Sequence, residues 1–162
     1  MPLCTFLSGG LDSSIITKFA SDYCEKQGLP PLDTYSIDYV DNDKNFVKSD
    51  FQPNSDGFYI DLMNNNLHTN HHKIVIDTPE LADALEDAMI ARDMPGMADI
   101  DSSLLLFCKN VKKQMTVALT GECADEIFGG YPWFFREDAL KSNTFPWSIS
   151  LTERQKLLNP YI

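Results

Sequence analysis

The sequence predicts an α/β fold in which helices cover both faces of a mostly parallel β-sheet. Short apolar or β-branched runs alternate with segments of helical periodicity along the chain, which is typical of parallel sheets. The 162 residues, of which 43% are hydrophobic, are enough for one domain with a buried core. We see no internal repeat and no domain boundary, so we expect residues 1–162 to form a single domain.

Four strands are expected, each short and rich in apolar, β-branched or aromatic residues. They cover residues 3–7, 34–40, 73–77 and 115–120. Helical spacing predicts helices whose apolar faces include Ile15 and Phe19, Tyr59 and Leu62, Leu81 and Leu85, and Leu104 and Phe107. Thr78 is expected to cap the third of these helices, with proline at its first position. Residues 41–54 are expected to form a long surface connection.

The first strand runs into S-G-G-L-D-S-S at residues 8–14, which leads directly into the first helix. A strand, a glycine-rich turn and a helix in this order gather free N–H groups and the positive end of a helix dipole, which bind phosphate well. Gly9 and Gly10 let the backbone pass close to a ligand, and the serines add hydroxyl donors. We interpret Asp12 as a Mg²⁺ ligand beside the phosphate. Alone, the heptad equally fits a serine-capped helix without a ligand.

The net charge of the chain excludes some classes of binding partner. The formal net charge is −11, and such a surface repels nucleic acid and anionic membranes. The sequence has neither an apolar run long enough to span a membrane nor a recognisable signal peptide. We therefore expect no nucleic-acid partner and no membrane association, and any phosphate ligand must be held by backbone dipoles, a metal and a few local cations.

The cysteine and histidine residues are weaker indicators of function than the loop at residues 8–14. The four cysteines, Cys4, Cys24, Cys108 and Cys123, include no C-x-x-C pair and are expected to be reduced thiols of a cytosolic protein. His68, His71 and His72 lie together before the third strand. A metal site is one interpretation, but a solvated strand entry is favoured because no matching Cys or carboxylate spacing accompanies them.

A second candidate loop follows the fourth strand, with the sequence T-G-E-C-A-D-E-I-F-G-G-Y at residues 120–131. Ligands of open parallel sheets bind outside the carboxyl ends of the strands, where both loops are expected. If the two strands are neighbours, Asp12 and Asp125 could share a cation. Gly121 would then let the backbone pass near a nucleotide, with Glu122 close to the reacting carbon. The alternative is a helix start whose acidic residues are favoured by the dipole.

Both loops resemble motifs of known enzymes. Residues 8–13 are similar to the pyrophosphate loop S-G-G-x-D-S of the N-type ATP pyrophosphatases, which split ATP between the α and β phosphates. Residues 121–131 resemble the G-E-x-x-D-E-x-F-G-G-Y signature of the synthetase domain of glutamine-dependent asparagine synthetases, and Y-P-W-F-F at residues 131–135 looks typical of that branch. The chain therefore resembles this family over essentially its whole length, which implies an adenine nucleotide alpha-hydrolase-like fold.

The resemblance implies an enzyme that activates the side-chain carboxylate of aspartate with ATP. An aspartyl-adenylate and pyrophosphate form, and ammonia, made from glutamine in a separate domain, then gives asparagine. ATP and Mg²⁺ are the implied cofactors and the cytoplasm the implied location. The residues implied to bind ATP are Phe6, Ser8, Gly9, Gly10, Asp12, Ser13, Ile37, Thr120 and Gly121. Of these, Phe6, Ile37, Thr120 and Gly121 are implied to line the adenosine pocket. Asp12 and Asp125 are implied to hold Mg²⁺, and Glu122 to accept a proton from the attacking ammonia.

The chain departs from the family in its extent. It has no N-terminal Cys nucleophile and no glutaminase domain, and it ends at Ile162, where family members continue into a helical region with triphosphate-binding lysines. We therefore expect a truncated ATP-binding domain that binds Mg·ATP but turns over poorly or not at all. Apolar surface is expected to be exposed, which makes self-association, as a homodimer, an expectation as well.

One further departure concerns the acceptor acid. Many family members have Thr and Arg before the helix that starts near Ser102, whereas residues 97–101 here read M-A-D-I-D. This difference leaves room for a related amide ligase, such as a β-lactam synthetase-like enzyme, that acts on another carboxylate. A non-catalytic nucleotide-binding fragment is the third interpretation.

Overall fold

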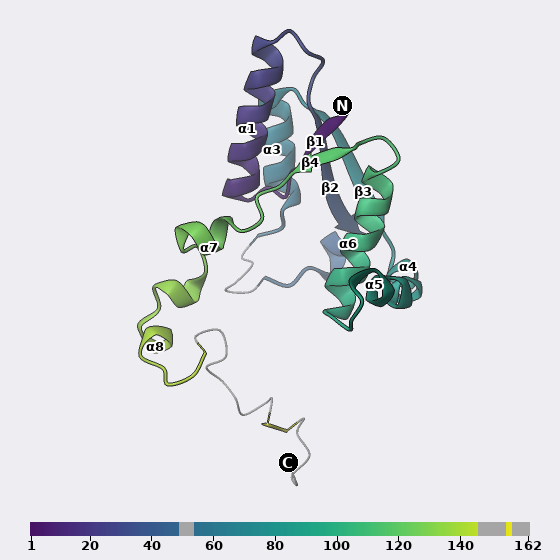
Figure 1. The fold of residues 1–162 in the computed structure, drawn as a ribbon. Coiled ribbons are helices and arrows are strands. Elements are labelled where there is room, and N and C mark those ends of the chain that lie inside the picture. The colour runs from purple at the N-terminus through teal and green to yellow at the C-terminus, as the bar shows by residue number, and fades with distance from the viewer. Residues whose placement is uncertain (49–53, 146–154, 157–162) are drawn as a thin grey trace. The chain divides into compact units, whose positions relative to one another are not determined.

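Strands and helices alternate as expected in the structure, a computed structural model that describes residues 1–48, 54–145 and 155–156 (Figure 1). The strands are β1 (Leu3–Phe6), β2 (Asp33–Tyr39), β3 (Asn70–Ile76) and β4 (Val117–Leu119). The helices are α1 (Leu11–Lys26), α2 (Asn42–Asn45), α3 (Gly57–Leu67), α4 (Thr78–Asp83), α5 (Leu85–Arg92), α6 (Ala98–Val111), α7 (Ala124–Phe128), the 3₁₀ helix η1 (Pro132–Phe134) and α8 (Glu137–Leu140). The chain divides into two compact units, residues 1–121 with the sheet and residues 122–162 with α7 to α8.

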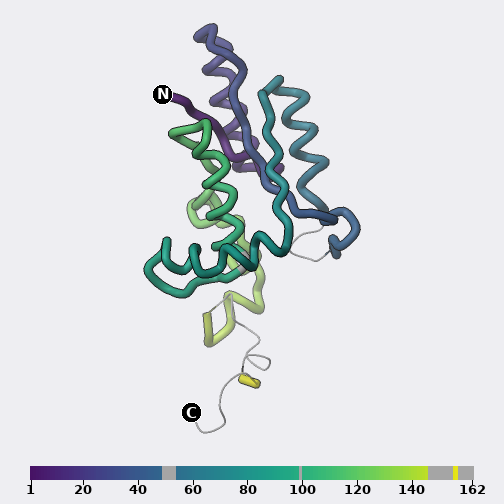
Figure 2. Tube along the Cα trace, turned by 90° about the vertical axis from the view of Figure 1, so that its right-hand side faces the viewer, coloured from purple at the N-terminus to yellow at the C-terminus, as the bar shows by residue number. Residues whose placement is uncertain are grey.

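The four described strands form one parallel sheet in the order β3-β2-β1-β4. Within this first unit, α1 and α3 lie on one face of the sheet and α6 on the other (Figure 1). Helices α4 and α5 pack against α6 rather than against the strands (Figure 2). The predicted α/β class, with a parallel sheet and helices on both faces, is therefore confirmed.

The face of the sheet under α6 holds the apolar core. Phe107 and Val111 of α6 pack on Cys4 and Tyr35, and the Phe6 and Phe107 rings meet edge to face with centroids 4.7 Å apart. Partly buried residues that extend this cluster are Phe6, Ile37, Ile74, Met115 and Ala118. Alternate residues of the strands point to this face, as the two-residue period of a strand requires.

The opposite face of the sheet, under α1, has a buried centre that is largely polar, with Thr5, Thr34 and Ser36 at 0–3% exposure. Thr17 of α1 donates a hydrogen bond of 3.0 Å to Thr5 of β1, and both side chains are inaccessible to solvent. The helical spacing correctly predicts α1, but its apolar residues Ile15, Phe19 and Tyr23 are 45%, 72% and 61% exposed. The expectation that the chain exposes apolar surface is therefore confirmed, and one such surface is the outer face of α1.

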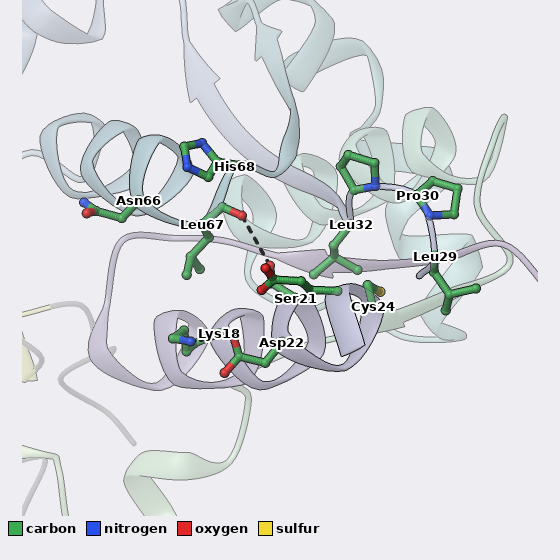
Figure 3. Close-up of a pocket in the computed structure, with 12 residues that line it drawn as sticks. Lys18, Ser21, Asp22, Cys24, Leu29, Pro30, Leu32, Asn66, Leu67 and His68 are labelled. Carbon is green, nitrogen blue, oxygen red and sulfur yellow. Dashed lines mark hydrogen bonds and ion pairs between the residues drawn. The ribbon is translucent and has the colours of Figure 1, made fainter. Parts of the chain in front are cut away.

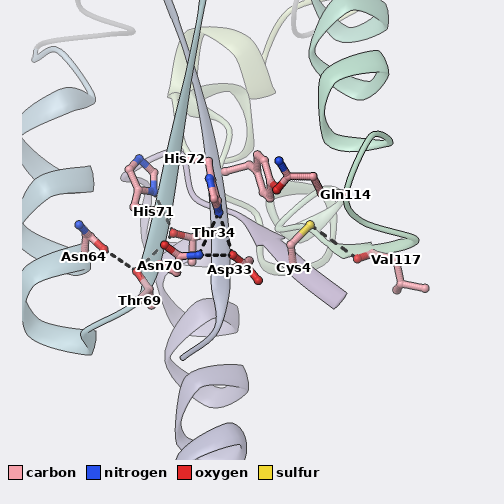
Figure 4. Close-up of polar contacts among 11 residues, drawn as sticks. Cys4, Asp33, Thr34, Asn64, Thr69, Asn70, His71, His72, Gln114 and Val117 are labelled. Atoms are coloured by element: carbon pink, nitrogen blue, oxygen red, sulfur yellow. Dashed lines mark hydrogen bonds and ion pairs between the residues drawn. The ribbon is translucent and has the colours of Figure 1, made fainter. Parts of the chain in front are cut away.

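Two histidines of β3 belong to polar contacts with β2 (Figure 4). The ring nitrogens of His71 lie 2.8 Å from Thr34 Oγ1 and 3.0 Å from Ser36 Oγ, and burial lowers the pKa of His71. On the other face, His72 Nε2 lies 2.8 Å from Asp33 Oδ1. These residues do lie at the start of a strand, as predicted, but they are half-buried and hydrogen-bonded rather than solvated.

Some predicted details differ in the structure. Asp77, not Thr78, caps α4, and Glu80 completes a capping box by accepting from the Asp77 N–H. The helix predicted to run on past Ala84 is divided there into α4 and α5. Each of the four cysteines lies in the described part of the chain and is a free thiol, and burial beside Asp33 raises the pKa of Cys4 to about 11.

The described residues contain no helix that is both long and apolar enough to cross a membrane. Residues 49–53 of the predicted surface connection, and the last residues of the chain, 157–162, lie outside the described part.

Candidate functional site

Residues 8–14 form the turn from β1 into α1. Gly10 is the N-cap residue of α1, and because glycine has no side chain, none caps the first-turn N–H groups of this 16-residue helix. Gly9 has a φ of +82°, in the left-handed region that favours glycine. The turn therefore presents uncapped backbone donors at the positive end of a helix dipole, an arrangement suited to an anion.

The Ser13 side chain ties this turn together. Its hydroxyl donates to the Gly10 carbonyl at 3.2 Å, accepts from the Ser8 N–H at 3.3 Å and lies 3.0 Å from the Ser8 hydroxyl. Ser13 is only 6% exposed, whereas Ser8 is exposed, so these contacts are partly buried. The loop is thus closed by its own residues, while the predicted role of both hydroxyls in holding phosphate stays a prediction.

Gly121 lies directly against the start of α1. β1 pairs with β4 in the sheet, so the two strands that lead into the candidate loops are neighbours, as the prediction required. A Cβ built on Gly121 would lie 2.9 Å from the Ser13 nitrogen and 3.1 Å from the Asp12 Cβ. Only glycine therefore fits here without a backbone shift, and the end of β4 borders the uncapped helix start.

Phe6 and Ile37, predicted to line an adenosine pocket, lie on the same face of the sheet. Phe6 is the last residue of β1 and Ile37 lies in the second half of β2, and both are partly buried beside the α6 core. Thr120 follows β4 and precedes Gly121. The structure thus brings these predicted residues to the carboxyl ends of adjacent strands, where open parallel sheets bind ligands.

Glu122 and Asp125 belong to the second unit, where α7 begins after Cys123 and ends at Phe128, with Gly129 as its C-cap. Gly130 donates from its N–H to the Asp125 carbonyl at 3.0 Å, and a Cβ at Gly130 would overlap the Asp125 carboxylate. The lack of a side chain at Gly130 therefore leaves room for the Asp125 carboxylate. The sharing of one Mg²⁺ by Asp12 and Asp125, and the role of Glu122 as a base, stay predictions.

The aromatic residues at the end of the second candidate loop, Tyr131 to Phe134, contact one another within the second unit. The Tyr131 and Trp133 rings stack with centroids 4.3 Å apart. The Tyr131 hydroxyl donates to Glu126 Oε1 at 3.1 Å, and this hydrogen bond raises the pKa of Tyr131. This hydrogen bond therefore links Glu126 of α7 to the aromatic residues that follow the helix. In the residues that the structure describes, no cluster of three or more His, Cys, Asp or Glu side chains is arranged to hold a metal ion.

The first unit also has hollows, one of them away from the predicted site residues and another lined in part by Ile37. One, of about 330 Å³, lies between the C-terminal halves of α1 and α3, where Ser21 donates to the Leu67 carbonyl (Figure 3). It includes no predicted site residue. The other, of about 480 Å³, is lined by residues that include Ile37, Asp38 and Ile60. Burial alone would raise the pKa of Asp38, but hydrogen bonds, above all from Lys73, lower it below its ordinary value.

The structure adds a segment that the sequence analysis missed. The first turn of α3 contacts the loop, because a Cβ on Gly9 would lie 2.9 Å from the Asp56 carbonyl oxygen and 3.1 Å from the Tyr59 Cβ. The sequence between residues 41 and 56 carries no motif that signals this contact. Only the packing of α3 beside α1 reveals it.

Comparison with known proteins agrees with the family that the two loops resemble. The family model described as asparagine synthase matches residues 1–162. The chain is 57% identical over 159 residues to glutamine-hydrolyzing asparagine synthetase 3 of Bacillus subtilis, which covers 98% of this chain and 26% of that protein. It is 31% identical over 168 residues to amidase chyE of Penicillium rubens and 27% identical over 148 residues to asparagine synthetase B of Escherichia coli, covering 98% and 84% of this chain and 24% of each relative. The chain thus spans about a quarter of the length of these relatives.

Proposed function

Because the chain belongs to the asparagine synthase family, we propose that it forms the ATP-binding part of an enzyme that converts aspartate into asparagine. The observation that carries the proposal is the turn at residues 8–14, whose uncapped helix start borders Gly121 at the carboxyl ends of β1 and β4. This cradle, which a Cβ would fill, suits the phosphates of ATP. Phe6 and Ile37, on adjacent strands, supply an apolar surface for the adenosine.

The residues present also fit Mg²⁺. Asp12 lies in the first turn of α1, beside the N–H groups proposed to hold phosphate. A carboxylate there would repel phosphate unless a cation lay between them, and Mg²⁺ in such sites is held by one or two carboxylates, water and phosphate oxygens. Asp12 and Asp125 are the proposed carboxylates. When bound, Mg²⁺ supplies positive charge that offsets the negative charge of the pyrophosphate.

The proposed reaction has two steps. A side-chain carboxylate oxygen of aspartate attacks the α-phosphorus of ATP, and the bond to the β-phosphate oxygen breaks as pyrophosphate leaves into the turn at residues 8–14. Ammonia then attacks the carbonyl carbon of the adenylate and AMP leaves. The nitrogen becomes cationic as its bond forms, so the Glu122 carboxylate stabilises it and accepts a proton. We propose that other parts of the polypeptide or a partner supply ammonia from glutamine.

Calorimetric titration with ATP tests the nucleotide site in the chain itself. With Mg²⁺, Asp12→Asn is expected to weaken ATP binding by roughly tenfold or more, because a charge-assisted interaction is lost. Without Mg²⁺, the same substitution is expected to leave binding unchanged or improved, because it removes a negative charge beside the phosphates.

Asp22→Asn is the matched control for this titration. It removes the same charge from the same helix, at a partly exposed residue paired with Lys18 four positions earlier. Its affinity for Mg·ATP is expected to equal that of the unchanged chain. Equal affinities of all three proteins for Mg·ATP would contradict the assignment of Asp12.

The second candidate function differs in the acceptor acid. The relative named amidase chyE matches 98% of the chain, the same share as Bacillus subtilis asparagine synthetase 3. The identity is nevertheless 57% to that synthetase and 31% to the amidase, so asparagine formation is favoured, and a related enzyme that forms an amide on another carboxylate stays the alternative.

A further inference from the structure

The loop at residues 8–14 has an external support that lies outside both sequence motifs. Gly9 lies against the first turn of α3, with its Cβ position 2.9 Å from the Asp56 carbonyl oxygen, 3.1 Å from the Tyr59 Cβ and 3.4 Å from the Ile60 Cγ1. The same Asp56 carbonyl accepts the hydrogen bond from the Ile60 N–H at 3.0 Å that opens the helix. A movement of this turn toward the loop would therefore press on the Gly9 backbone.

Helix α3 is anchored at both ends, so its first turn has a defined position. Ile60, at 7% exposure, is the buried residue of this helix, and it also borders the hollow beside Ser36 and His71. At the other end, the Leu67 carbonyl accepts a hydrogen bond from Ser21 of α1 at 3.3 Å. Helix α3 therefore packs beside the helix whose start forms the phosphate cradle, and Ile60 fixes the end that touches Gly9.

We propose that Ile60 is a positioning residue for the ATP site, acting through Gly9 and without contact with ATP. The expected effect on ATP affinity rests on the proposed function. The close approach of Ile60 to Gly9 does not, because it is present without a ligand. Gly9 has a left-handed φ of +82°, so its peptide groups can rotate widely unless a neighbour restricts them. The side chain of Ile60 and the carbonyl of Asp56 supply that restriction.

The test compares two truncations of buried aliphatic side chains in the same unit. Ile60→Ala is expected to raise the Kd for Mg·ATP roughly tenfold or more, because small misplacements of a binding group are costly. Leu32→Ala is the matched control, since Leu32 is 4% exposed and lines the hollow at the other end of α1, which contains no predicted site residue. Its Kd is expected to stay within about twofold of the parent value. Both variants are measured at a temperature at which circular dichroism shows them folded.

Two conservative variants keep the test decisive if the alanine variant fails to fold. Ile60→Val removes one methylene and is expected to raise the Kd by less than Ile60→Ala, and Ile60→Leu, which keeps the volume, is expected to restore most of the affinity. Equal weakening in Leu32→Ala and Ile60→Ala would overturn the proposal, because loss of general stability would then explain both. Parent affinity in Ile60→Ala would also overturn it.

Amide NMR of the chain without nucleotide separates this inference from the proposed function. Ile60→Ala is expected to shift the Gly9 and Gly10 amide signals and speed their hydrogen exchange, and to leave Gly28, after α1, unchanged. Leu32→Ala should not move the Gly9 and Gly10 signals. If the parent chain fails to bind Mg·ATP, the proposed function fails, yet these signals still decide whether Ile60 positions the loop. Unchanged Gly9 and Gly10 signals in Ile60→Ala would overturn the inference.

Discussion

Replacing Gly121 by alanine is expected to weaken Mg·ATP binding by roughly 100-fold while the chain stays folded. The new Cβ would lie 2.9 Å from the Ser13 nitrogen and 3.1 Å from the Asp12 Cβ, so the start of α1 or the end of β4 must move. These are backbone and near-backbone atoms, which cannot yield as the tip of a flexible side chain can. Both segments border the proposed phosphate cradle, so either shift disturbs it. Calorimetric titration with Mg·ATP measures the loss.

Gly57→Ala is the matched control for this substitution. Gly57 opens α3, and a Cβ there would meet no atom within 4 Å. Alanine is a better helix former than glycine, so this variant is expected to bind Mg·ATP as the parent does and to be at least as stable. If Gly121→Ala kept parent affinity, the end of β4 would not form part of the nucleotide site.

Replacing Glu122 by glutamine is expected to reduce asparagine formation by roughly 10²- to 10⁴-fold, because the group that accepts the proton from attacking ammonia is lost. Activation of aspartate precedes this proton transfer and is expected to survive. Since the chain spans about a quarter of its relatives, the assay uses a chimera. In it, this chain replaces the matching segment of Bacillus subtilis asparagine synthetase 3, to which it is 57% identical. Asparagine is measured with ammonia as the nitrogen source.

A change of nucleophile sharpens the assignment of Glu122. Hydroxylamine has a far more acidic conjugate acid than ammonia, so it needs less help to lose its proton, and Glu122→Gln should impair its reaction less. Glu137→Gln removes the same charge from an exposed ion pair with Lys141 in the same unit and should change neither reaction. Equal losses with both nucleophiles, or loss of aspartate activation in Glu122→Gln, would mean that Glu122 serves another purpose.

The helix α1 shows what a hydrophobic period can and cannot predict. The spacing of Ile15, Phe19 and Tyr23 correctly indicates a helix, but these side chains point away from the sheet. The sheet face beneath α1 carries Thr5 instead, and Thr17 meets it through a hydrogen bond. Threonine counts as polar in any periodicity analysis, so a buried face built from hydroxyl groups gives no apolar signal, although its polar atoms are satisfied internally.

For the two candidate loops too, the local sequence predicts the turns but not the distant segments that pack against them. Glycines at positions 9, 10 and 121 signal tight backbone, and the chain order of strand, turn and helix predicts where anions bind. The structure supplies the partner of each close approach: Asp12 and Ser13 for Gly121, and the first turn of α3 for Gly9. That last contact joins segments almost fifty positions apart, for which no local pattern exists, and it emerges only from the packing of α3.

Exchange of labelled pyrophosphate into ATP, measured in the chimera with Mg²⁺ and without any nitrogen source, tests the proposed function most directly. Adenylate formation is reversible, so an enzyme that activates aspartate returns the label to ATP when aspartate is present. We expect exchange that requires aspartate and is lost in Gly121→Ala. Exchange supported by another carboxylate but not by aspartate would contradict asparagine synthesis and favour the related amide ligase. Binding of Mg·ATP without exchange for any acid would identify the chain as a nucleotide-binding module without catalysis.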